Sequence, residues 1–262
     1  MTPPVVLTIA GSDSGGGAGI QADLKTFAAL RTYGASVITA VTAQNTRDVR
    51  DVYALPADVV GAQLDAVLDD LPVLAVKVGM LAAADIAGAV AVRVRAGRLP
   101  NLVIDPVLTA SSGRRLGVVA AIERLLPYAT VVTPNAVEAS GLVGRPIRSP
   151  DDMADAAAHL GKAGPGVVVV TGGDVAGGDV VTDVVWVRGD VRMIHHPRLA
   201  TRNTHGTGCT FSAAIAARLA AGDDVVQAVD HAERYVARAL AGARDWLIGT
   251  GAGPLDHFGW ST

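Results

Sequence analysis

The chain has 262 residues, of which 50% are hydrophobic and 18% charged, and its formal net charge is −3. This composition is that of a globular protein with ample core, and it excludes a disordered chain. The absence of a basic excess predicts no nucleic-acid partner. No uncharged apolar run reaches the ~18 residues that suggest a membrane span, so we expect no membrane partner either.

The cysteine content indicates a reducing compartment. Cys209 is the only cysteine, so the chain cannot form an internal disulfide, and no Cys/His spacing typical of a metal site occurs. Residues 1–13 lack a basic stretch before the apolar run and become glycine-rich early, which is unlike a signal peptide. We therefore expect a cytoplasmic protein.

Short apolar runs alternate with stretches of helical periodicity along most of the chain. The expected strands are residues 5–10, 36–41, 74–78, 101–105, 130–133 and 166–171. The expected helices are residues 20–33, 56–71, 83–95, 120–126 and 151–163. Residues 180–187 and 191–195 then predict an antiparallel hairpin, and two helices are expected to begin at Gly208 and Asp224.

This alternation predicts a mostly parallel sheet covered by helices on both faces. Because no linker, repeat or low-complexity segment divides the chain, we expect one domain over residues 1–262. The predicted fold class is α/β, a three-layer α/β/α sandwich with a mostly parallel central sheet and an antiparallel edge.

Polar and glycine-rich residues follow the expected strands, where ligands bind in sheets of this kind. They are Gly11-Ser12-Asp13, Gln44-Asn45, Gly79-Met80, Asp105-Pro106, Pro134-Asn135 and Gly172-Gly173. Turns need such residues in any case, but turn formation does not require Gln44, Asn45 or Asn135. We therefore favour one active-site rim at the carboxyl ends of the strands.

The first glycine-rich loop, GSDSGGGAGIQADLKT, starts at Gly11. It is not a dinucleotide fingerprint, because no carboxylate follows at the next strand end. It is not a P-loop, because no glycine immediately precedes Lys25. Asp23 lies in the first turns of the following helix. It either faces the rim or is a surface acid that complements the helix dipole, and the sequence leaves both open.

The second glycine-rich loop, THGTGCT, begins at Thr204. The N–H groups of residues 206–209 can point together at an anion at the positive end of a helix. Cys209 in that first turn is expected to have a thiol pKa below the free value. The alternative is a small buried hydrophobic residue, and His205 either contacts phosphate or caps the turn.

Several segments together resemble one family. GSD-GGGAGIQADLKTFAAL, VTAQNT, KVGML, DPVLTASSG, TPNAVEA, NTHGTGCT and GPLDHF follow one another from residue 11 to residue 258. This series resembles the hydroxymethylpyrimidine/phosphomethylpyrimidine kinases of thiamine biosynthesis, which have the ribokinase-like fold. The resemblance implies phosphorylation of 4-amino-5-hydroxymethyl-2-methylpyrimidine by ATP, and then of the monophosphate to the diphosphate.

The resemblance also implies the substrate residues. Gln44 offers a donor and an acceptor that match an aminopyrimidine edge, and Asp23 would take the remaining polar contact. Met80 and Val107 would form the apolar wall for the ring, while Gly11 would allow close approach.

For phosphoryl transfer, the resemblance implies that Gly206 and Gly208 help to form an anion hole. Cys209 would accept the hydroxyl proton, because it stands where sugar kinases have an aspartate base. Asp105 and Glu138 would lie at Mg²⁺. The remaining ATP-binding residues would be Asn135, Thr171, Gly173, His205 and Thr207.

Two departures from the family pattern remove lysines near the phosphates. Thr171 stands where the family has Lys, and Ser111 stands in place of a second Lys. The nearest alternatives are a pyridoxal kinase of the same branch and a non-catalytic pyrimidine-binding regulator. The sequence leaves open whether both phosphorylation steps occur, and the resemblance suggests a homodimer.

Overall fold

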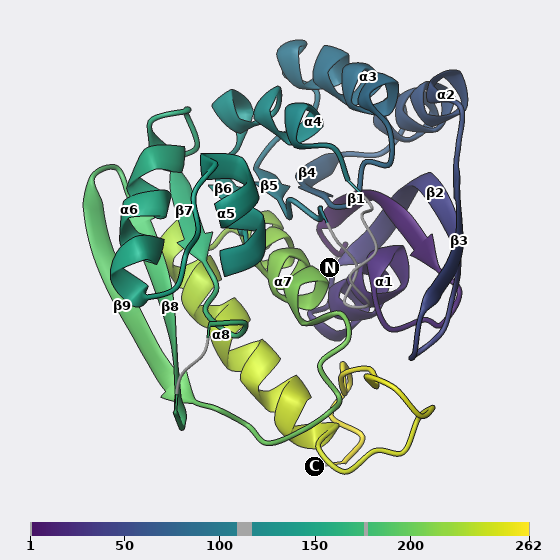
Figure 1. Cartoon of the computed structure of the whole chain (residues 1–262). Helices are drawn as coiled ribbons and strands as arrows, with labels where there is room; N and C mark the ends of the chain where they lie inside the picture. Colours follow the sequence, from purple (N-terminus) through teal and green to yellow (C-terminus); the bar gives the residue numbers. More distant parts are fainter. Residues whose placement is uncertain (1, 109–116, 176–177, 262) are drawn as a thin grey trace.

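One nine-stranded sheet forms the centre of the computed structural model, which describes residues 2–108, 117–175 and 178–261 (Figure 1). The sheet order is β3-β2-β1-β4-β5-β6-β7-β8-β9. Its strands are β1 (Val5–Asp13), β2 (Tyr33–Gln44), β3 (Val49–Ala54), β4 (Val73–Val78), β5 (Leu102–Ile104), β6 (Val131–Val132), β7 (Val167–Val170), β8 (Val180–Val187) and β9 (Asp190–Pro197).

The sheet is parallel in its middle and antiparallel at both edges. Strands β2, β1, β4, β5, β6 and β7 run parallel to one another, while β3 pairs antiparallel with β2, and β8 and β9 form an antiparallel hairpin beside β7. The predicted fold class is confirmed. The sequence anticipated the hairpin edge but not β3, whose side chains are mostly exposed or half-buried and follow no long apolar run.

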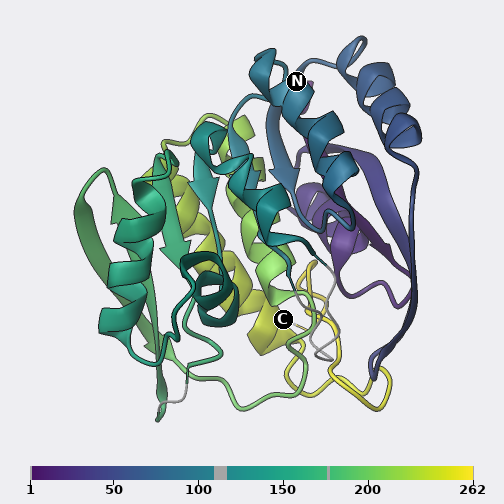
Figure 2. The same cartoon turned by 45° about the horizontal axis from the view of Figure 1, so that its top comes forward.

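Helices cover both faces of the sheet, which produces the three layers (Figures 1 and 2). One face carries α2 (Ala57–Leu68), α3 (Ala84–Arg95), α4 (Val119–Glu123), α5 (Ala136–Val143) and α6 (Pro150–Gly161). The other carries α1 (Gly19–Ala29), α7 (Thr207–Ala220) and α8 (Val225–Gly242), and a short 3-10 helix, η1 (Leu126–Tyr128), follows α4. No helix in the described ranges has the length and apolarity to cross a membrane.

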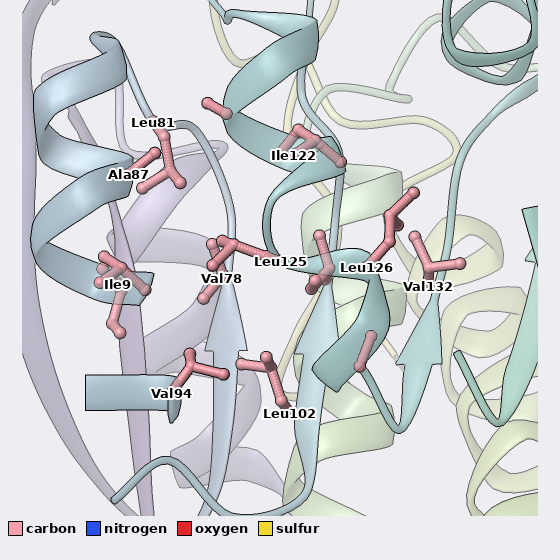
Figure 3. Close-up of a cluster of buried hydrophobic side chains, with 14 of the residues drawn as sticks. Ile9, Val78, Leu81, Ala87, Val94, Leu102, Ile122, Leu125, Leu126 and Val132 are labelled. Carbon is pink, nitrogen blue, oxygen red and sulfur yellow. The ribbon is translucent and has the colours of Figure 1, made fainter. Parts of the chain in front are cut away.

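Apolar side chains on each face of the sheet form a core with the helices above it. Figure 3 shows part of the core on the α3 and α4 side, where Ile9 and Val78 of the sheet lie beneath Leu81 and Ile122. Strands β1 and β7 are buried on both faces, which explains their continuous apolar runs.

Local signals account for some of the helix boundaries. Asn135 caps α5 through a capping box with Glu138, and Ser149 caps α6 in the same way with Asp152. Helix α1 ends at Ala29, earlier than the predicted Tyr33, because Arg31 adopts a left-handed backbone and the chain enters β2. Helix α5 was not predicted, because its eight residues are too few for a clear periodic pattern.

Candidate active site

The rim predicted from the sequence forms at one edge of the sheet. Because the six central strands are parallel, the segments that follow them meet at their carboxyl ends. The strand ends carry Asp13 at the end of β1, Gln44 at the end of β2, Met80 after β4, Asp105 after β5, Asn135 after β6 and Thr171 after β7. The expected convergence of strand ends is therefore confirmed.

Asp13 organises the first glycine-rich loop. Its carboxylate accepts hydrogen bonds from the backbone N–H groups of Gly15 (2.8 Å), Gly17 (3.0 Å) and Ala18 (2.9 Å). Although burial by itself would raise the pKa of Asp13, the hydrogen bond from His205 and those from the loop amides hold that pKa below its usual value. Asp13 was expected only as one residue of the rim, although an aspartate ahead of three glycines is typical of such side chain-to-backbone turns.

The N-terminus of α7 packs directly against this loop. Gly206 has a left-handed backbone with φ of +86°, and any side chain there would collide with the carbonyl oxygen of Gly17. Gly208 lies near Asp105, since a methyl group at position 208 would be 4.0 Å from Asp105 Oδ1. The Thr207 N–H already donates to Thr204 O at 3.2 Å, which leaves the following amides of the turn for an anion.

Cys209 lies in the first turn of α7 and is partly exposed. Its thiol pKa is raised, chiefly because burial disfavours the thiolate; the Lys77 charge opposes this shift, while the carboxylates of Asp105 and Asp23 add to it. The expectation of a lowered thiol pKa is therefore wrong. Removing a charged sulfur from water raises the thiol pKa by more than the dipole of the helix N-terminus lowers it.

A fully buried ion pair lies behind Cys209. The Lys77 ammonium on β4 contacts both carboxylate oxygens of Asp23 at 2.9 Å, and Thr8 Oγ1 donates to Asp23 at 2.6 Å. Lys77 also lies 3.6 Å from Asp105. Burial alone would lower the pKa of Lys77, but the two carboxylates overcome it and hold the pKa above its usual value.

This ion pair revises the interpretation of Asp23. The alternative of a surface acid is wrong, because Asp23 has no exposed area. Its carboxylate is already occupied by Lys77 and Thr8 rather than open at the rim, so its predicted contact with a substrate stays a prediction. Lys77 was missed, although it lies in the KVGML segment that carried the resemblance; a lysine inside an otherwise apolar strand was the available signal.

Gln44 and His205 meet at the rim, from opposite ends of the chain. Gln44 Nε2 lies 3.1 Å from His205 Nε2, and His205 Nε2 lies 2.9 Å from Asp13 Oδ2. Both side chains line a hollow of about 400 Å³ between residues 44–49 and the C-terminal segment 250–252. The structure thus brings His205 to Gln44, the predicted contact of the pyrimidine. The expected contact of His205 with ATP stays a prediction.

Gly11 and Met80 lie against each other, as the predicted apolar wall requires. A side chain at position 11 would collide with Met80 Cε, and the Met80 carbonyl accepts a hydrogen bond from Thr39 Oγ1 at 2.7 Å. Val107 is half-buried after β5, two residues beyond Asp105. Ser111, one of the two departures, lies outside the described residues.

Asp105 and Glu138 are two buried acids of the rim, and the Asp105 charge acts on Glu138. Burial and then the Asp105 charge raise the pKa of Glu138 to about 8. Glu138 Oε2 accepts the Asn135 N–H at 3.0 Å, and Asn135 Oδ1 accepts the Glu138 N–H at 2.8 Å. Asn135 therefore caps α5, and a carboxylate pair of this kind has the hard oxygen donors that suit Mg²⁺.

The loop after β7 is held by Arg198. Thr171 forms an isolated bridge with Asn135, and Gly173 is exposed. The Arg198 guanidinium donates to the carbonyl oxygens of Gly173 at 2.9 Å and Val175 at 3.0 Å. A cation therefore lies against this loop although position 171 carries none.

The sheet order, the helices on both faces and a glycine turn that presents a helix N-terminus at the strand ends are those of a ribokinase-like kinase. Residues 13–256 match the phosphomethylpyrimidine kinase family. The chain belongs to this family and is a phosphotransferase.

Three similar proteins illustrate the relationship. A hydroxymethylpyrimidine/phosphomethylpyrimidine kinase of Rhizobium meliloti is 48% identical over 260 residues, with 97% of each chain covered. The structure of a Staphylococcus aureus pyridoxal kinase in complex with AMP-PCP and pyridoxal has a TM-score of 0.89 at 36% identity, covering 99% of this chain and 95% of that one. A Clostridium difficile phosphomethylpyrimidine kinase structure has a TM-score of 0.78 at 38% identity, covering 90% and 99%.

Proposed function

We propose that this protein transfers the γ-phosphoryl group of ATP to the hydroxymethyl group of 4-amino-5-hydroxymethyl-2-methylpyrimidine, and then to the resulting monophosphate, for thiamine biosynthesis. The observation that carries this proposal is the contact between the Gly206 turn and the Gly17 carbonyl, because it brings the α7 N-terminus against the loop that follows β1. A pyrimidine beside Gln44 and a phosphate at the α7 amides would then share one rim.

The chain's own residues supply positioning and charge stabilisation. The amides of Gly208 and Cys209 would hold the transferring phosphoryl group, with the helix dipole behind them. Cys209 would take the hydroxyl proton as the new P–O bond forms. Because burial raises its pKa, the thiol is protonated at rest. It would accept the hydroxyl proton only after releasing its own proton to solvent, and the neighbouring Lys77 charge favours the thiolate that this release leaves.

Asp105 and Glu138 would hold Mg²⁺, which neutralises phosphate charge when bound. The fit rests on the chemistry of the donors, because two buried carboxylates offer the hard oxygen atoms that a divalent cation prefers. Asn135, Thr171, Gly173 and Thr207 remain the proposed ATP contacts. Arg198 would partly replace the family lysine, since its charge lies against the loop at Gly173.

Three broader statements belong to the same proposal. One domain spans residues 1–262, because the sheet takes strands from residue 5 to residue 197 and α7 and α8 cover it. A homodimer follows from the family resemblance alone. A cytoplasmic location is supported by the single free cysteine.

A pyridoxal kinase is the second candidate, and the likeness to the Staphylococcus aureus enzyme favours it. Pyridoxal also presents a hydroxymethyl group, and its ring would fit beside Met80. A non-catalytic regulator is less well supported, because a pure binder needs neither the glycine turn at Gly206 nor a thiol at the α7 N-terminus.

Product analysis separates these candidates. The protein is incubated with Mg²⁺-ATP and the hydroxymethylpyrimidine, with pyridoxal in parallel, and monophosphate is resolved from diphosphate. Diphosphate formation supports the bifunctional kinase and shows that a lysine at position 171 is dispensable. Monophosphate alone restricts the function to the first step. Pyridoxal phosphate as the main product favours the second candidate. Binding of the pyrimidine without any product would contradict the proposed kinase activity.

A further inference from the structure

His205 connects the two glycine-rich loops of the rim to Gln44, the proposed contact of the pyrimidine. Its side chain is 11% exposed, and its ring lies against Gly17, where any side chain would collide with His205 Cδ2. Its backbone N–H donates to Gly253 O at 3.0 Å, so the C-terminal segment holds the residue from the other side. The imidazole is therefore fixed in place, and the atoms that surround Nε2 determine its protonation.

The Asp13 carboxylate requires a proton on His205 Nε2. Asp13 accepts three backbone N–H groups, which is the environment of an ionised carboxylate. An ionised carboxylate only accepts hydrogen bonds, so the nitrogen 2.9 Å from Asp13 Oδ2 must be the donor. A ring nitrogen that carries a proton cannot also accept a hydrogen bond from an amide.

This proton bears on the orientation of the Gln44 side chain. The Gln44 amide nitrogen lies 3.1 Å from His205 Nε2, and this orientation would place two donors against each other. Its oxygen lies 3.4 Å from Thr42 Oγ1, but the single Thr42 hydroxyl proton is engaged by the Ser12 carbonyl at 3.0 Å. Rotating the amide by half a turn satisfies both contacts, because its oxygen then meets the imidazole N–H and its nitrogen donates to Thr42.

We propose that His205 is a specificity-determining positioning residue, which fixes the Gln44 amide with its oxygen toward the imidazole and its nitrogen toward Thr42. The Gln44 amide then keeps one oxygen lone pair and one N–H for a ligand, with the acceptor on the His205 side and the donor on the Thr42 side. An aminopyrimidine matches this order, with its amine N–H on the His205 side and its ring nitrogen on the Thr42 side. The inference rests on the proposed function, in which Gln44 contacts the pyrimidine.

The test compares two substrates whose hydrogen-bonding order is opposite. The 4-oxo analogue of the hydroxymethylpyrimidine carries a carbonyl oxygen in place of the amine and an N–H at the adjacent ring nitrogen. We expect the unaltered protein to prefer the amino compound in kcat/KM, mainly through KM. His205→Phe keeps a ring but no N–H, so the Gln44 amide can turn and the preference should fall about tenfold or more. His205→Gln places an amide N–H near the Nε2 position and should restore much of the preference.

Equal losses for both substrates in His205→Phe, with the preference intact, would overturn the proposal and leave His205 a structural residue. No preference in the unaltered protein would overturn it as well. Gln44→Ala separates this failure from that of the proposed function. If Gln44→Ala abolishes the preference and His205→Phe does not, Gln44 still recognises the pyrimidine and only the role of His205 is contradicted. If no phosphorylated pyrimidine forms at all, the proposed function itself is contradicted.

A spectroscopic readout needs no activity and no destabilising variant. Nitrogen-15 shifts of the histidine rings at neutral pH report which ring nitrogen carries the proton, and the signal lost in His205→Gln identifies His205. We expect a protonated Nε2. An unprotonated Nε2 would overturn the proposal, because the Gln44 amide nitrogen could then donate to Nε2.

Discussion

At the scale of single residues, the buried pair of Lys77 and Asp23 has the largest energetic consequence. Both side chains have no exposed area, so neither charge has water to solvate it. The Thr8 hydroxyl completes the shell around Asp23. Breaking such a pair leaves an uncompensated charge in the core, whereas removing both charges does not.

Lys77→Met should therefore lower the free energy of unfolding by about 3–5 kcal/mol, because Asp23 is left buried and unpaired. Urea denaturation measures this loss. The double variant Lys77→Met with Asp23→Leu should recover most of the stability. A single variant as stable as the unaltered protein would contradict the prediction.

Cys209 is the residue on which turnover should depend. Cys209→Ala removes the proposed proton acceptor but leaves the pyrimidine contacts, so kcat should fall roughly 10²-fold or more while KM stays nearly unchanged. Steady-state kinetics with the hydroxymethylpyrimidine checks this. An equal loss of kcat and of substrate affinity would mean that Cys209 only shapes the pocket.

At the scale of elements, the site depends on the contact between the α7 N-terminus and the loop after β1. Gly206 is needed twice, for its left-handed backbone and for the space beside the Gly17 carbonyl. Asp13 and His205 strengthen the same junction through their hydrogen bond.

Gly206→Ala should cost more stability than Gly222→Ala, which serves as the matched control. Gly222 also has a left-handed backbone, with φ of +97°, but nothing lies within 4 Å of a methyl group there. The control should cost about 1–2 kcal/mol for the strained backbone alone, and Gly206→Ala should exceed it because of the added collision. Equal unfolding free energies for the two variants in urea would show that the junction has room for a side chain.

At the scale of the whole molecule, acidic side chains between the β8–β9 hairpin and α8 influence stability. Asp183 of β8, His196 of β9 and Glu233 of α8 offer ligand-type atoms within 4.8 Å of one another. Glu233 Oε1 is fully buried without a hydrogen-bond partner among the described residues. Burial and then the Asp183 charge raise the pKa of Glu233 to about 8, while the His196 charge opposes this shift.

This shift predicts a stability that falls as pH rises. Between the ordinary glutamate value of 4.5 and about 8, the folded state holds a proton on Glu233 that the unfolded state has lost. Glu233→Gln removes that dependence, so relative to the unaltered protein it should gain roughly 2 kcal/mol or more on going from pH 5 to pH 8. Urea unfolding at both pH values measures the gain.

Glu123→Gln is the control, because Glu123 is exposed and should show no such gain. The prediction is contradicted if the difference between Glu233→Gln and the unaltered protein is the same at pH 5 and pH 8.

Much of the fold was predictable because its signals are local. Valine-rich runs marked the central strands, and the residues at their ends marked the rim, including Gln44 and Asp105. Strand β3 and helix α5 escaped because they are short and carry weak periodicity. The roles of Lys77 and Asp13 were not predicted, because they come from partners distant along the chain. Lys77 pairs with Asp23, and Asp13 pairs with His205.

The sequence by itself determined the alternation of most strands and helices along the chain, the parallel centre of the sheet and the family. These depend on patterns between near neighbours and on motifs in a set order. Tertiary structure alone decided the electrostatics of the site. The helix position of Cys209 predicted a lowered pKa, but burial raised it. The sequence left open whether His205 contacts phosphate or caps the turn, and folding placed its ring between Asp13 and Gln44. Desolvation and contacts of this kind depend on which distant segments are packed together.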